Sequence, residues 1–202
     1  MANIKEKHDF LSAEECDFLI WMAECQDNWD ILPGYFWDNR TIDFFTTLQH
    51  RRYSSPALQR LSMQIYRKKQ EFVSKFVGKD VNVDFMVIMR LEPGVGQEPH
   101  VFDGAGLGRV AGSAIFLNDN FRGGETIYPH CNRVITPKTG TIYVSGADEE
   151  HIHGIAQVFD NTRYVIISTW TDKPLSDRYA DGIQKMSDYL NMCDQAEMPA
   201  IN

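Results

Sequence analysis

The sequence predicts a mainly β fold: a double-stranded β-helix of the jelly-roll, cupin-like type, flanked by N-terminal helices. Three observations predict it. Helical patterns predominate in residues 1–80, short strand-like segments follow from residue 81, and Gly, Pro, Asn or Asp separates most of those segments. Seven or eight short strands with turns between them are typical of a closed double-sheet barrel. Helices that precede such strands in the chain are expected to cover one outer face.

The N-terminal 80 residues carry two helix patterns. Ser12 followed by Glu15 is a capping box that opens the first helix, and apolar residues then recur at helical spacing. A second helix is predicted over 55–77, where Pro56 suits the first turn. Its expected buried stripe is Leu58, Leu61, Ile65, Phe72 and Phe76. Between the helices, the aromatic-rich stretch 29–45 is interpreted as strand and loop.

The strand-like segments are rich in β-branched and aromatic residues, as strands require. They span 81–91, 112–117, 124–128, 133–136, 140–144, 154–158 and 163–171. We interpret the chain as one domain over 1–202: a helical support (1–80), a jelly-roll core (81–172) and a C-terminal tail (173–202) with a short helix over 180–191.

Composition narrows the class of protein. The net charge of −8 argues against nucleic acid or an anionic membrane as the main partner. The N-terminus lacks the pattern of a secretory signal, and no apolar run approaches the roughly 20 residues that span a bilayer. Four cysteines without a Cys-x-x-Cys pair suit reduced thiols. We therefore expect a cytoplasmic protein; its oligomeric state is left open.

One constellation carries chemistry. A non-haem Fe(II) site needs two imidazoles and one carboxylate on one face of the metal, with the other face open to a cosubstrate and O2. His100 and Asp103 lie close together, and His153 follows about 50 residues later, the order expected if opposite strands supply the ligands. Arg163 then opens a predicted strand, where its guanidinium could hold a carboxylate in a bidentate fork.

A family resemblance joins these residues and covers most of the chain. Gly108-Arg109, Ala114 to Asp119 (AIFLND) and Gly123 to Pro129 (GGETIYP) resemble the "R…YLND…GGET.FP" run of the prolyl 4-hydroxylase branch of the 2-oxoglutarate/Fe(II) dioxygenases. Further similar segments are Phe10 to Cys16, Val134 to Gly140, His153 to Val158 and Asn161 to Tyr164. Each motif alone is weak, and their order and gaps make the set specific.

The resemblance implies a role for each matching residue. His100 and His153 would ligate iron, Arg163 would bind the far carboxylate of 2-oxoglutarate, and Thr126 would line that pocket. Phe116 takes a position often held by a tyrosine that donates to the cosubstrate, so that hydroxyl is lost. Hydroxyls often found in the family are also missing at Leu91 and Ile167. We therefore expect a dry cosubstrate pocket held chiefly by Arg163.

The carboxylate ligand is where the chain departs from the family. The family has His-x-Asp, whereas this chain has His100-Val101-Phe102-Asp103, which aligns Phe102 with the ligand. Three interpretations stay open. The backbone turns after Phe102 and Asp103 enters the site, which we favour; water or a halide replaces the carboxylate, as in related halogenases; or the site has decayed. Glu98 is a minor alternative ligand.

The distal histidine also has an alternative. His151 and His153 would share one face of a strand, and we favour His153 because its distances along the sequence to Val158 and Arg163 fit the family. His151 is then expected either to support the ligands from behind or to be solvated, and we favour the solvated position.

The predicted function is a 2-oxoglutarate-dependent oxygenase. It would hydroxylate a prolyl or other amino-acid side chain, free or in a peptide, and release succinate and CO2. Fe(II) and 2-oxoglutarate are the expected cofactors, and ascorbate is a further candidate. No catalytic residue is expected beyond the metal centre, and Phe102, Phe116 and Trp170 would form a hydrophobic shell around it. The alternative is a catalytically inactive jelly-roll module that binds a ligand or serves a structural role.

Overall fold

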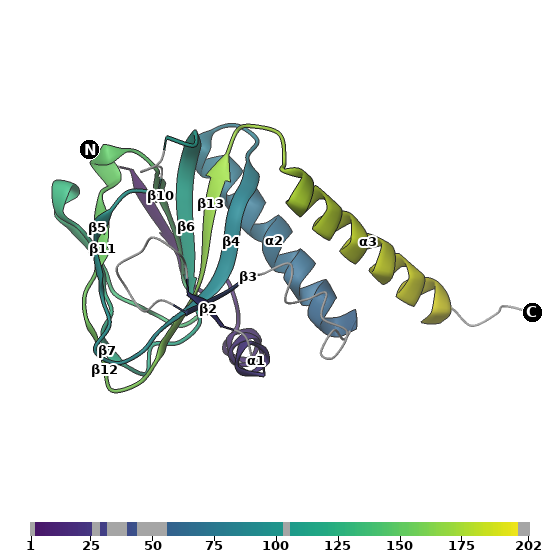
Figure 1. Ribbon diagram of the computed structural model, residues 1–202, viewed down its shortest axis with the longest axis horizontal. Helices are drawn as coiled ribbons and strands as arrows, with labels where there is room; N and C mark the ends of the chain where they lie inside the picture. The colour runs from purple at the N-terminus through teal and green to yellow at the C-terminus, as the bar shows by residue number, and fades with distance from the viewer. Residues whose placement is uncertain (1–2, 26–28, 32–39, 44–55, 103–105, 198–202) are drawn as a thin grey trace, which may run out of the picture.

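The computed structural model describes residues 3–25, 29–31, 40–43, 56–102 and 106–197. Its largest element is an antiparallel sheet of seven strands in the order β1-β10-β6-β13-β4-β3-β2. The strands are β1 (Ile4–Lys7), β2 (Asp30–Ile31), β3 (Arg40–Asp43), β4 (Asn82–Leu91), β6 (Arg109–Phe116), β10 (Ile142–Gly146) and β13 (Arg163–Thr171). Figure 1 shows this major sheet at the centre of the molecule.

A smaller sheet faces the major one. It has four strands in the order β5-β11-β8-β9, and β7 pairs with β12 beside it. Their bounds are β5 (Gln97–His100), β7 (Arg122–Gly123), β8 (Thr126–Tyr128), β9 (Arg133–Ile135), β11 (His153–Ile155) and β12 (Val158–Phe159), with short 3-10 helices η2 (Pro129–Cys131) and η3 (Glu149–His151). Two antiparallel sheets facing each other confirm the predicted jelly-roll, with helices at both ends of the chain.

Helices cover the outer face of the major sheet. Helices α2 (Pro56–Val77) and α3 (Asp177–Glu197) lie on the side away from the small sheet, and α1 (Ala13–Glu24) lies at one end (Figure 1). The capping box predicted at Ser12 is present, because its hydroxyl accepts from the Glu15 amide while the Glu15 carboxylate accepts from the Ser12 amide. No helix within the described ranges is long and apolar enough to cross a lipid bilayer.

The alternation of strand residues divides the interior into two cores. On β13, Val165 faces the small sheet, whereas Ile166 and Trp170 face α2. The helix-side core is built mainly by α1, α2, α3 and one face of the major sheet. The core between the sheets is smaller and surrounds a cavity. Trp170 thus lies on the wrong face for the shell predicted around a metal, and its indole Nε1 donates to the Ser113 hydroxyl at 2.8 Å.

Several boundaries differ from the predicted ones. The C-terminal helix, Asp177–Glu197, is longer than the expected 180–191, and it buries Tyr179 and Met186. Residues 1–80 also supply strands, since β1 pairs with β10 at the edge of the major sheet. Strand β5 was not predicted because it contains Pro99 and has no β-branched residue; pairing with β11 defines it. The Leu58 side chain and most of 29–45 lie outside the described residues.

Candidate active site

A cavity of about 250 Å³ opens between the two sheets. The major sheet supplies its floor and the small sheet its opposite wall. Its lining residues are Phe85, Val87, Met89, Gln97, His100, Val101, Phe102, Arg109, Tyr143, His153, Ile155, Arg163, Ile167 and Thr169. Two histidines and two arginines in an otherwise largely apolar hollow are the pattern of a ligand site rather than of a core.

The two predicted histidines meet across a strand pair. Strands β5 and β11 run antiparallel with His100 opposite His153, and their ring centroids lie 4.5 Å apart. His100 Nδ1 is 2.9 Å from the Glu98 carbonyl oxygen, and His153 Nδ1 is 2.9 Å from that of His151. A carbonyl only accepts, so each Nδ1 carries the proton and each lone pair lies on Nε2, the atom through which such an imidazole can bind a metal.

Burial keeps both imidazoles neutral. It lowers the pKa of His100, and it lowers that of His153 to about 3, with a smaller contribution from neighbouring His100. Neutral imidazole is the form that binds metals, so near pH 7 neither ring must lose a proton first.

Phe102 fills the place beside these rings. Its ring centroid is 4.4 Å from that of His153, and its side chain is buried. The ring lies over Gly112 on β6, where a Cβ would come within 1.9 Å of the Phe102 Cδ2 atom. Only glycine therefore admits Phe102 in this pose.

The third ligand is not supplied by the described residues. Asp103 lies outside them, and within them no three His, Cys, Asp or Glu side chains are grouped so that they could hold a metal. The Glu98 side chain is exposed and does not line the cavity.

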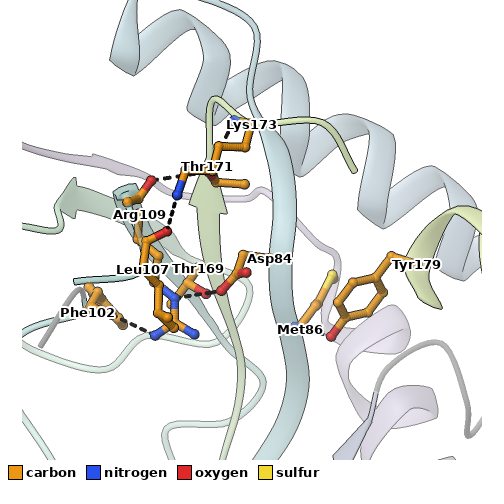
Figure 2. A network of polar contacts seen from close by, with 10 residues as sticks. Asp84, Met86, Phe102, Leu107, Arg109, Thr169, Thr171, Lys173 and Tyr179 are labelled. Carbon is orange, nitrogen blue, oxygen red and sulfur yellow. Dashed lines mark hydrogen bonds and ion pairs between the residues drawn. The ribbon is translucent and has the colours of Figure 1, made fainter. Parts of the chain in front are cut away.

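Arg109 connects the backbone at Phe102 to strand β4. Its Nη1 donates to the Phe102 carbonyl at 2.8 Å, and its Nε pairs with the Asp84 carboxylate of β4 at 2.6 Å (Figure 2). At the other end of the segment, the Thr171 hydroxyl and the Lys173 ammonium donate to the carbonyls of Gly108 and Leu107. The sequence showed Arg109 only as part of a motif; its pairing with Asp84 was not foreseen.

Arg163 lies at the far end of the cavity floor. It is 1% exposed, its Nε donates to the Gly124 carbonyl at 3.2 Å, and its Cζ is 5.3 Å from the Phe116 ring centroid. Its Nη1 is buried and has no hydrogen-bond partner among the described residues. Burial lowers the pKa of Arg163 to about 10, so it stays charged near pH 7.

The Gly-Gly-Glu-Thr motif makes room for this arginine. Gly123 and Gly124 adopt φ of +72° and +70°, a conformation that side chains rarely adopt. A Cβ on Gly123 would lie 1.9 Å from the Gln157 carbonyl oxygen, and one on Gly124 would lie 3.0 Å from Arg163 Cδ. The two glycines thus bring a backbone carbonyl against the guanidinium.

The other residues predicted to bind the cosubstrate do not line the cavity. Thr126 and Phe116 are fully buried and lie outside the set of lining residues. Tyr143 of β10, which the sequence analysis missed, stands in front of them: its hydroxyl is 3.4 Å from the Thr126 hydroxyl and its ring is 5.6 Å from that of Phe116. Burial raises the pKa of Tyr143, so its hydroxyl keeps its proton.

His151 is buried rather than solvated, so that expectation was wrong. Its Nδ1 lies 2.6 Å from the Asp148 carboxylate, and its ring rests against Gly146. Its backbone carbonyl, not its side chain, contacts His153. Of the two histidines, His153 lines the cavity.

The side chains fit a metal and an acid ligand as far as they are described. Two neutral imidazoles aim at one region, and a buried, charged guanidinium with an unpartnered nitrogen lies in the same hollow. A buried unpaired charge is costly, so an anion at Arg163 would be strongly stabilised.

Comparison with known proteins gives matches to solved structures alone: no family model and no curated protein matches the chain. A viral collagen prolyl hydroxylase of Paramecium bursaria Chlorella virus-1, in its 2OG complex, is 17% identical with TM-score 0.58 over 84% of this chain and 96% of that one. A prolyl hydroxylase from Trichoplax adhaerens, in complex with a hypoxia inducible factor peptide fragment, is 14% identical with TM-score 0.65 over 85% and 84%.

HygX from Streptomyces hygroscopicus, with nickel and 2-oxoglutarate bound, is 10% identical with TM-score 0.62 over 84% of this chain and 83% of that one. At such identities the likeness concerns the fold. The chain therefore has the fold of the prolyl 4-hydroxylases and other 2OG–Fe(II) oxygenases.

Proposed function

We propose that this chain is a non-haem Fe(II), 2-oxoglutarate-dependent oxygenase that hydroxylates a prolyl or other amino-acid side chain. The observation that carries the proposal is one cavity in which the ring centroids of His100 and His153 lie 4.5 Å apart and the Nη1 atom of Arg163, in the wall, has no hydrogen-bond partner among the described residues. The structural likeness to prolyl hydroxylases, one of them in complex with a peptide, supports the substrate class.

The residues divide the work. The Nε2 atoms of His100 and His153, with the Asp103 carboxylate, would hold Fe(II), and Arg163 would hold the far carboxylate of 2-oxoglutarate. When bound, iron and 2-oxoglutarate would supply an oxidant from O2 with release of succinate and CO2. The chain itself orients the acid and excludes water through apolar lining side chains such as Met89 and Ile155.

The test is spectroscopic. Fe(II) and 2-oxoglutarate are added to the protein without oxygen, and the visible charge-transfer band of the chelate is recorded. A band that requires both additions is expected. The intact chain showing no band at saturating concentrations of both would contradict the proposal.

The third ligand is tested by two neighbouring substitutions. Asp103→Ala should abolish retention of Fe(II) after desalting, because two imidazoles alone hold the ion weakly. Phe102→Ala should retain the metal, because phenylalanine supplies no donor atom. Metal analysis of both variants decides; retention in Asp103→Ala would remove this residue from the site.

One observation favours a second candidate, a catalytically inactive binding module. Phe102 occupies the position beside the histidines where the family pattern has a carboxylate. On that account an acid ligand would still bind at Arg163 without any metal, and no chelate band would form. Calorimetric titration of metal-free protein alongside the spectroscopic test separates the two functions.

A further inference from the structure

Tyr143 is placed to reach the Arg163 end of the cavity. On the major sheet its partner across β10 and β6 is Ala114, whose own partner on β13 is Ile167. Since Ala114 carries only a methyl group, it leaves room for the tyrosine ring over β6, where the ring packs beside Phe116. The ring is 3% exposed and lines the cavity.

The Phe116 ring connects the tyrosine to the arginine. Its centroid is 5.6 Å from that of the Tyr143 ring and 5.3 Å from Arg163 Cζ, so both polar side chains pack on this one apolar ring. Burial raises the pKa of Tyr143, and the nearby positive charge of Arg163 lowers it by a smaller amount.

Both polar groups could give a donor to a ligand. The Tyr143 hydroxyl lies 3.4 Å from the Thr126 hydroxyl, a length at the weak end of the hydrogen-bond range, and it also interacts with the Tyr128 hydroxyl, so a ligand would have to draw it from these neighbours. Arg163 Nη1 has no acceptor in the described part of the chain. A carboxylate has two oxygens, and it can accept from a guanidinium and a phenol at once.

We propose that the Tyr143 hydroxyl donates to the same ligand carboxylate that Arg163 binds. The donor lost at Phe116 would thus be replaced from the neighbouring strand. This inference rests on the proposed function and refines it: the cavity would select a 2-oxo acid with a second, distal carboxylate. It also replaces the expectation of a dry pocket held chiefly by Arg163.

Calorimetry separates the contribution of this hydroxyl from the metal chelate. Protein loaded with Zn(II), which supports no redox chemistry, is titrated with 2-oxoglutarate and with 2-oxobutyrate, which lacks the distal carboxylate. Tyr143→Phe should weaken 2-oxoglutarate binding by roughly ten- to hundredfold, the usual loss for a hydrogen bond to a charged group. Binding of 2-oxobutyrate should not change.

Tyr66→Phe is the matched control. Tyr66 is also buried, but it lies on the helix side of the sheet, where it stacks on Trp170. Its loss of a buried hydroxyl should leave both affinities at the wild-type values. Circular dichroism checks that each variant is folded.

A second substitution tests whether the Tyr143 hydroxyl replaces the one missing at Phe116. Phe116→Tyr in the Tyr143→Phe background returns a hydroxyl from β6, and it should recover most of the lost 2-oxoglutarate affinity. Tyr143→Phe that binds 2-oxoglutarate as tightly as wild type would overturn the inference. Wild-type protein that binds neither acid would instead contradict the proposed function, and this inference with it.

Discussion

A basic side chain is buried against each face of strand β13, and the two differ in their hydrogen-bond partners. On the helix side, Lys69 of α2 is fully buried and its ammonium nitrogen donates to the Ile166 carbonyl at 2.9 Å. On the cavity side, Arg163 is equally buried, yet one of its terminal nitrogens has no partner in the described part of the chain.

The difference lies in what burial does to each charge. Burial lowers the pKa of Lys69 well below its ordinary value, so the amine can shed its proton and join an apolar core. Arg163 keeps its proton near pH 7, because its pKa falls only to about 10. The helix side thus favours an uncharged amine. The cavity side retains a charged guanidinium whose Nη1 has no partner in the described part of the chain, and an incoming anion would compensate that charge. That contrast marks which face is built for a ligand.

Arg163→Met should give the largest effect on ligand binding. Removing the guanidinium should weaken 2-oxoglutarate binding by at least about a hundredfold, since losing one partner of a buried charged pair costs roughly 2–5 kcal/mol. The same change should raise the free energy of unfolding of the ligand-free protein, because an unpaired buried charge is removed. Calorimetry and urea denaturation measure the two effects. Unchanged affinity would exclude Arg163 from the acid site.

Gly112→Ala tests the packing beside the histidines. The new methyl group would meet the Phe102 ring, so we expect a loss of about 1–3 kcal/mol in unfolding free energy, the usual cost of overpacking. Phe102→Ala in the same chain should restore part of that loss, because it removes the clash. Denaturation of the two single variants and the double variant checks this. Additive losses would mean that the two residues do not meet.

Lys69→Met should give the smallest effect and leave the ligand site untouched. The unfolded chain binds a proton at Lys69 that the folded chain does not, over the pH range between the lowered pKa of the folded state and the ordinary lysine pKa, so wild-type stability should rise with pH in that window. The substitution should flatten this slope and add on the order of 1 kcal/mol at pH 7, with no change in 2-oxoglutarate affinity. A slope that persists in the variant would assign it to other groups.

Much of the fold could be predicted because local patterns determine it. The β-branched run from Arg163 to Thr171 is observed as one strand with those bounds, and Ser12 caps α1 as its capping box predicts. Strand β5 could not be predicted, because Pro99 and its polar neighbours carry no strand signal and pairing with β11 defines it. The placement of Trp170 was an avoidable error, since alternation along β13 already separates it from Arg163.

The sequence predicted some of the cavity residues and missed others. The order of motifs brought His100, His153 and Arg163 to one cavity, as expected. Tyr143 was missed because a tyrosine in a strand does not reveal which face it occupies until the strand register is known. The tie between Arg109 and Asp84 was missed for the same reason, since it joins two strands that are not neighbours in the sheet.

A crystal structure of the protein soaked with Mn(II) and a non-reactive 2-oxoglutarate analogue tests the central claim most directly. The account predicts a metal ion held by the Nε2 atoms of His100 and His153, and a carboxylate of the analogue within hydrogen-bond distance of Arg163 Nη1. A metal bound elsewhere, or an analogue that leaves Arg163 without a partner, would contradict it.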